Sequence, residues 1–191
     1  MATNRKSLAP ALMFFTCVIF QIISMIISSS RFGYFHYNFI NIIVSIILPL
    51  ALGAICFINS RSKALPPLYL VYALSRLFLD GFNVIGRNNG VIYSIAGDAV
   101  ADTAPSLSAV NITTIFVAVI FLLLFALTFL KRSFRTSNAG LICKLLLLLL
   151  AVVVVVMTII RIRFLFRPYF NPAYLNNCII SINAVYLLLK N

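Results

Sequence analysis

The sequence predicts an all-α protein, a single bundle of helices that crosses a membrane. Of its 191 residues, 63% are hydrophobic and only 9% are charged, and the mean hydropathy is +1.10. A soluble domain usually has about 25% charged residues, enough to cover its surface. Charge is too scarce here for such a cover, so the outer layer of the bundle must face lipid. One transmembrane domain is therefore expected over residues 1–191.

The number of spans follows from the lengths of the apolar stretches, because a helix needs about 20 apolar residues to cross a bilayer. The first stretch is longer than the apolar region of a secretory signal, about 7–15 residues, and is expected to be retained. A further stretch, 65–86, spans only if Arg76 and Asp80 lie within the membrane. Including it, we predict six spans: 8–29, 39–58, 65–86, 106–130, 141–160 and 172–189.

The positive charges predict the orientation of these spans. Six spans divide most of the basic residues between two sides, and the richer side receives Arg5, Lys6, Arg61, Lys63, Lys131, Arg132, Arg135 and Lys190. Cytoplasmic loops carry an excess of Lys and Arg, so both termini are expected in the cytoplasm. The opposite side would receive the arginine-rich segment 161–167, which suits the headgroup layer. The loop 87–105 is long enough for a short interfacial helix or a re-entrant segment.

The third predicted span has a polar face. Steps of three and four residues, which follow one side of an α-helix, connect Tyr69, Tyr72, Arg76, Asp80, Asn83 and Arg87. The other positions of this stretch are mostly apolar. Arg76 and Asp80 are one turn apart and can form an ion pair. Charges at membrane depth are costly and usually point inward, so this pair either fixes the helix against its neighbours or belongs to a ligand site.

This segment resembles a known family. The residues 68–82, Leu-Tyr-Leu-Val-Tyr-Ala-Leu-Ser-Arg-Leu-Phe-Leu-Asp-Gly-Phe, are similar to the late Tyr-Gly-x-x-Arg-Phe-x-x-Glu-x-x-Arg helix of prolipoprotein diacylglyceryl transferases. The resemblance extends over about residues 60–130, the C-terminal part of that family. It implies a bacterial plasma-membrane protein that binds an anionic phospholipid, with functional residues at Arg76 and Asp80. If the chain is an enzyme, the resemblance implies a lipid (diacylglyceryl) transferase activity.

The chain also departs from the family pattern. Asp80 stands in place of Glu, Ala73 in place of Gly, and Asn83 in place of the following Arg, with Arg87 one turn later. The family's His-Gly-Gly-type motif and its arginine-rich signature are absent, and the one histidine, His36, lies between aromatic residues. The expected ligand-binding set is Tyr72, Arg76, Asp80, Asn83 and Arg87, and no catalytic residue is assigned.

Other site types find little support in the sequence. One histidine, three acidic residues and four separated cysteines do not form a metal-ligand set, and no nucleotide or cofactor motif is present. The net charge of +12 comes from basic residues between apolar stretches, so lipid phosphates, not nucleic acid, are the expected partners. The last span carries Asn176, Ser181 and Asn183, which are expected to hydrogen-bond a neighbouring helix.

Three functions remain open from the sequence alone. The first is a lipid-binding relative of the transferases, with Arg76 and Arg87 holding the headgroup. The second is a small six-span transport or substrate-binding subunit, which would bind a polar solute. The third is an accessory membrane protein that works through a protein partner in the membrane and binds no ligand.

Overall fold

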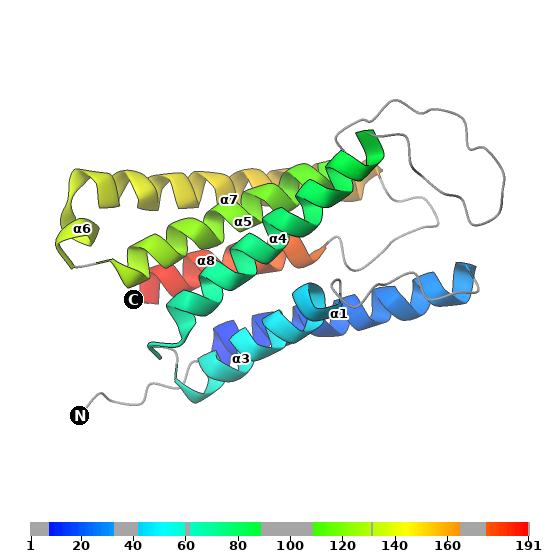
Figure 1. Cartoon of the computed structure of the whole chain (residues 1–191), viewed down its shortest axis with the longest axis horizontal. Coiled ribbons are helices and arrows are strands. Elements are labelled where there is room, and N and C mark those ends of the chain that lie inside the picture. Colours follow the sequence, from blue (N-terminus) through cyan, green and yellow to red (C-terminus); the bar gives the residue numbers. More distant parts are fainter. Residues whose placement is uncertain are drawn as a thin grey trace.

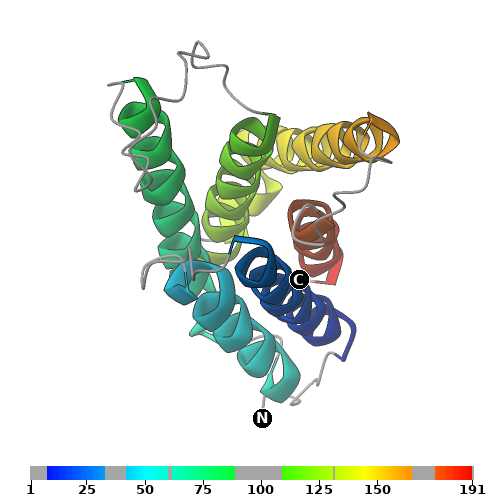
Figure 2. The same cartoon turned by 90° about the vertical axis from the view of Figure 1, so that its right-hand side faces the viewer.

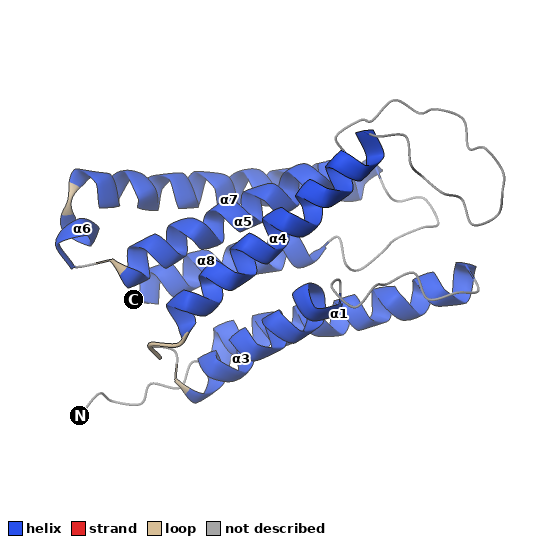
Figure 3. Ribbon diagram, in the orientation of Figure 1, coloured by secondary structure: helices blue, strands red, loops and turns tan. Residues whose placement is uncertain are grey.

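The structure, a computed structural model, describes residues 8–32, 42–59, 62–88, 109–130, 132–164 and 175–190. Within these ranges it consists of helices without strands (Figure 3). The long helices are α1 (Leu8–Phe32), α4 (Leu65–Asn88), α5 (Ala109–Phe129) and α7 (Asn138–Phe164). The shorter ones are η1 (Ile43–Ile47), α3 (Leu48–Ile58), α6 (Arg132–Thr136) and α8 (Asn176–Lys190). The all-α class predicted from the sequence is confirmed for the described residues.

Three of the described helices are long and apolar enough to cross a membrane. They are α1 over Leu8–Ile27, α5 over Ile112–Phe129 and α7 over Asn138–Ile160. Large apolar side chains cover their outer surfaces, among them Leu12, Ile19, Leu145 and Leu149, each at least half exposed. A helix bundle that is apolar both inside and outside requires hydrocarbon as its solvent. The prediction of a membrane protein is confirmed at this level.

The other predicted spans also form helices, at positions close to those expected. α4 carries the polar face, and η1 with α3 forms a shorter apolar helix over Ile43–Ile58. α8 starts at Asn176, later than the expected residue 172, and α7 extends to Phe164, beyond the expected residue 160. Arg161 and Arg163 therefore continue α7 as helix, and the expected place of the segment 161–167 in the headgroup layer stays a prediction. The loop 87–105 lies almost wholly outside the described residues.

Consecutive helices alternate in direction (Figure 1). Between α1 and α8, Asn183 contacts Pro10 and Asn176 contacts Gln21, so these two helices are antiparallel. One end of the bundle contains the starts of α1, α4, α6 and α7 and the ends of α5 and α8 (Figure 1). The described cations Lys63, Arg135, Lys144 and Lys190 belong to this end, which we call the basic end.

α5 is the centre of the packing and contacts α4, α7 and α8. In the end-on view it lies between α4 and α7, while α4 forms one edge of the bundle (Figure 2). The core includes Phe14, Phe121, Leu124 and Leu187, all fully buried. The rings of Tyr69 and Tyr72 meet the Phe121 ring edge-on at centroid distances of 5.7 and 4.8 Å. Aromatic contacts of this kind hold α4 to α5.

Local sequence explains several helix boundaries. Pro66 and Pro67 lie in the first turn of α4, where a missing N–H removes no helical hydrogen bond. Pro49 lies in the first turn of α3, and the preceding residues form the π-helical η1, in which the Leu48 N–H reaches the Ile43 carbonyl. A proline cannot donate to the turn before it, so the wider π turn accommodates the interruption.

A sharp corner joins α6 to α7. The Ser137 hydroxyl accepts the Gly140 N–H at 3.2 Å and donates to the Phe134 carbonyl at 2.6 Å. Gly140 is buried against the backbone of α6, and a Cβ there would overlap the Phe134 carbonyl oxygen. This glycine is therefore required for the close approach of the two helices, and α6 itself was not predicted from the sequence.

Gly140→Ala is expected to lower the free energy of unfolding by about 1–3 kcal/mol, as for other overpacked sites. The measurement is the temperature at which the buried thiols of Cys17 and Cys56 react with a maleimide fluorophore in detergent. Ser133→Ala is the control, because Ser133 is exposed on α6. An unchanged midpoint for Gly140→Ala would contradict the tight corner.

Candidate functional site

The polar face of α4 is built around Arg76 and Tyr72. The Arg76 Nε donates to the Tyr72 hydroxyl oxygen at 3.2 Å, and the guanidinium carbon lies 5.4 Å from the centre of the Tyr72 ring. Tyr72 is fully buried, whereas Arg76 is partly buried. Because Tyr72 is itself fixed against Phe121, it gives the cation a rigid acceptor and an aromatic face. Two members of the predicted ligand set are thus in contact.

Arg76 lies near the middle of the apolar helices. It is within electrostatic range of Cys17, which is the midpoint of the apolar stretch Leu8–Ile27 of α1. Its partner Tyr72 contacts Phe121, near the midpoint of the apolar stretch Ile112–Phe129 of α5. In a membrane this guanidinium would therefore lie deep in the hydrocarbon layer, where a charge costs at least about 2.5 kcal/mol.

The remaining predicted residues lie on α4 beyond Arg76. Asp80, Asn83 and Arg87 are part of the helix, spaced so that they continue the same side toward its C-terminal end. Their side chains are outside the described part of the structure, and the Arg76–Asp80 ion pair remains a prediction. His36, Asp98 and Asp102 also lie outside the described residues.

A second polar cluster joins α8 to α1 and α5. The Asn176 side-chain amide donates to Gln21 Oε1 at 3.2 Å, and the Asn177 amide donates to the hydroxyls of Thr113 and Thr114 at 3.1 and 3.2 Å. All five side chains are buried. The predicted hydrogen-bonding face of the last span is therefore observed.

The middle of α8 is attached to the start of α1. The Asn183 amide donates to the Pro10 carbonyl at 3.0 Å, and the Ser181 hydroxyl donates to the Asn177 carbonyl within α8 at 2.8 Å. Asn183 and Ser181 are both fully buried. α8 is thus held to α1 by polar contacts two turns apart.

The two polar regions approach each other at Cys17. Its thiol lies 3.9 Å from the Asn176 carbonyl oxygen and within electrostatic range of Arg76. Cys17 thus contacts the asparagine cluster directly and feels the charge of Arg76 on the polar face of α4. The sequence is compatible with this arrangement of polar residues but does not predict it.

Some buried polar atoms at or beside the asparagine cluster have no hydrogen-bond partner among the residues that the structure describes. They include Ser24 Oγ and Asn176 Oδ1, and Ser24 is one turn from Gln21 on α1. An unpaired polar atom in an apolar interior costs about 1–3 kcal/mol. Such atoms are available to a water molecule or a polar ligand.

Sequence reasoning missed the partners of the asparagines. Gln21 and Ser24 on α1 and Thr113 and Thr114 on α5 are isolated polar residues in apolar stretches. Each helix alone gives no indication of which neighbour these residues face. A side-chain amide or hydroxyl within an apolar span predicts that the residue forms a hydrogen bond, but it does not predict the partner.

No group of three His, Cys, Asp or Glu side chains that could hold a metal ion occurs in the part of the chain that the structure describes. The four cysteines are free, and Cys17 and Cys56 are buried. Comparison with family models, with curated proteins and with solved structures found no match to this chain. The geometry of the polar residues therefore carries the functional argument.

Asn177→Ala is expected to destabilise the bundle by about 0.6–1.7 kcal/mol for each of its two hydrogen bonds, the range measured between membrane helices. The thermal thiol-reactivity midpoint measures this loss. Asn138→Ala is the matched control, because Asn138 is exposed at the start of α7. Equal midpoints for the two variants would contradict a stabilising role for the Asn177 contacts.

Proposed function

We propose that this protein is a multi-pass plasma-membrane protein that binds the headgroup of an anionic phospholipid at the polar face of α4. The observation that carries the proposal is Arg76, a partly buried cation at the middle depth of an apolar bundle, held by the buried Tyr72. A guanidinium has five N–H donors in a fork that fits phosphate oxygens. A cation at this depth is a functional candidate by default.

The headgroup would enter along α4. Arg76 and Arg87 are eleven residues apart on one side of the helix, about 16 Å at 1.5 Å per residue. In this arrangement the phosphate meets Arg87 near the membrane surface and Arg76 at depth, with Asn83 and Asp80 between them. The peripheral place of α4 (Figure 2) supports access from the surrounding lipid.

In this proposal the bundle crosses the membrane six times, with both termini in the cytoplasm. The alternating directions of the helices and the cations of the basic end support it, since positive residues are retained on the cytoplasmic side. The described lengths of α3 with η1 and of α8, 16 and 15 residues, are below the roughly 20 needed for a 30 Å core. These two helices would need a locally thinner bilayer or continuation beyond their described ends.

Lipid binding is proposed here without transferase activity. The transferase-like segment provides the Arg and carboxylate positions, but the His-Gly-Gly-type and arginine-rich motifs of those enzymes are absent from the sequence. A catalytic residue therefore has no candidate on which a reaction could be built.

A second candidate function, binding of a small polar solute as a transport subunit, rests on the asparagine cluster. Ser24 Oγ and Asn176 Oδ1 are buried without partners, beside the hydrogen-bonded Gln21. A solute with hydroxyl or amide groups would satisfy these atoms. Such a ligand would not need a negative charge, which distinguishes it from the phospholipid.

The orientation of α4 can be tested with single cysteines in a variant that lacks the native ones. Ala64→Cys is expected to react with a membrane-impermeant maleimide only from the cytoplasmic side, and Asn88→Cys only from the outside. Intact cells and inverted vesicles provide the two sides. Labelling of both positions from the same side would mean that α4 does not span.

Lipid binding can be tested by native mass spectrometry of the full chain from phosphatidylglycerol nanodiscs. Arg76→Gln is expected to reduce the occupancy of one bound phosphatidylglycerol by at least about tenfold, because losing one charged hydrogen bond costs about 1.5–3 kcal/mol. Lys63→Gln, an exposed cation at the basic end, is the control. Equal lipid retention in both variants would reject the α4 site and favour the polar-solute candidate.

A further inference from the structure

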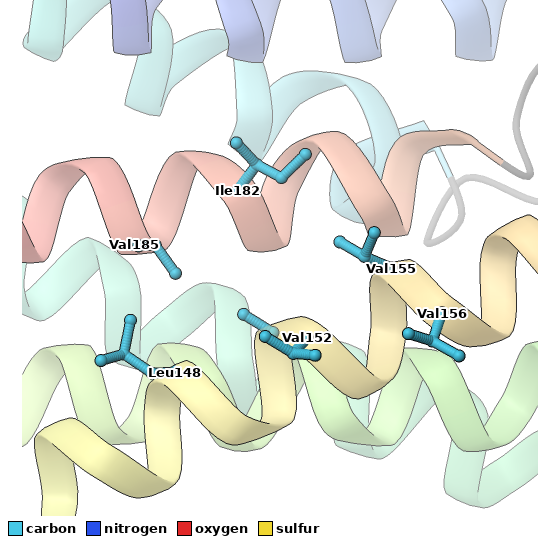
Figure 4. A pocket seen from close by; sticks show the side chains of 7 residues that line it. Leu148, Val152, Val155, Val156, Ile182 and Val185 are labelled. Carbon is cyan, nitrogen blue, oxygen red and sulfur yellow. The ribbon is translucent and has the colours of Figure 1, made fainter.

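A groove between α7 and α8 is lined only by aliphatic side chains. Leu148, Val152, Val155 and Val156 contribute from α7, and Ile182 and Val185 from α8 (Figure 4). The groove has a volume of about 250 Å³. An open aliphatic groove of this size can take a segment of a hydrocarbon chain several methylene groups long.

The groove belongs to the least covered of the three apolar spans. Only 22% of the apolar stretch of α7 is buried, compared with 44% for α1 and for α5. Leu145, Leu149 and Val152 are all more than half exposed. In a membrane this side of α7 faces lipid, so acyl chains are the molecules in direct reach of the groove.

One end of the groove leads to cations. Lys144, Leu148, Val152 and Val156 are spaced by four residues and form one row along α7. The Lys144 Nζ donates to the Arg135 carbonyl oxygen at 3.1 Å, so its chain reaches from the row to the α6–α7 corner. The buried Arg135 Nε has no acceptor. Two cations therefore lie beyond the Leu148 end of an aliphatic groove.

Helices α5, α6, α7 and α8 contain no acidic residue, because all three acidic residues of the chain lie at or before Asp102. The phosphate of an anionic lipid would supply a negative charge to Lys144 and Arg135. An aliphatic groove that ends at two cations matches the two parts of one molecule, an acyl chain and a phosphate.

We propose that the groove between α7 and α8 binds one anionic glycerophospholipid, with an acyl chain along the valines of α7 and the phosphate against Lys144 and Arg135. This site is separate from the proposed α4 site and lies at the basic end, so it would take a lipid from the cytoplasmic leaflet. It does not depend on lipid binding at Arg76.

The experiment counts phosphatidylglycerol molecules bound to the full chain by native mass spectrometry after transfer from mixed phosphatidylglycerol and phosphatidylcholine nanodiscs. The double variant Lys144→Gln/Arg135→Gln is expected to lose about 25-fold in occupancy of one lipid, at about fivefold for each cation near a membrane surface. Val152→Trp, which fills the groove, is expected to lose the same lipid.

Matched controls separate this site from general effects. Lys190→Gln removes a cation of the same end, one that interacts electrostatically with Cys56 of α3. Leu146→Trp adds an indole about 120° around α7 from Val152. Both are expected to retain the lipid. Arg76→Gln is also expected to retain it, so the two lipid sites fail independently.

Two outcomes would overturn the proposal. One is equal loss of phosphatidylglycerol in the test variants and in their controls. The other is efficient disulfide formation between two copies through Val152→Cys in liposomes, which would make the groove an interface with a second chain. For the unmodified protein, retention of phosphatidylcholine as readily as phosphatidylglycerol would also count against it, and this measurement does not depend on the folding of any variant.

Discussion

The cost of a positive charge inside hydrocarbon is the constraint on which the rest of this structure depends. In the proposed six-span arrangement Arg76 would lie near the middle of the membrane, where lipid cannot solvate it, because its partner Tyr72 contacts Phe121 near the midpoint of the apolar stretch of α5. Tyr72 provides an oxygen acceptor and an aromatic face, and Phe121 holds Tyr72 in place. The packing of α4 on α5 is thus also the means by which the protein keeps a guanidinium at this depth.

The polar contacts of α8 determine which helices it packs against. Between helices in a membrane, apolar side chains do not distinguish a neighbouring helix from lipid, so hydrophobicity alone cannot select partners. Asn176 and Asn177 select α1 and α5 by hydrogen bonds to Gln21 and to two threonines, and Asn183 selects the first turn of α1. Specific amides and hydroxyls therefore determine the arrangement of helices whose surfaces are otherwise interchangeable.

Apolar length alone located most of the helices, because a span of about 20 residues leaves a strong signal in sequence. The period of three and four residues also placed Arg76 and Tyr72 on one side of the same helix, where the structure shows them in contact. Contacts between helices were not predictable in this way. Nothing in the sequence near Asn177 predicts its contact with Thr113. The five-residue α6 and its contact with Gly140 depend on backbone packing, which no residue pattern predicts.

In the proposed six-span arrangement, the depth of Arg76 would also determine how strongly α4 responds to voltage. Carrying one elementary charge across the whole membrane is worth about 2.3 kcal/mol per 100 mV. A slide of α4 by one helical turn, about 5.4 Å of a 30 Å core, would gain about 0.4 kcal/mol per 100 mV for Arg76. Asp80 travels on the same helix with the opposite sign and reduces the net charge moved. A membrane potential would therefore change the free energy of a sliding α4 only slightly, and the aromatic packing of α4 against α5 opposes such sliding.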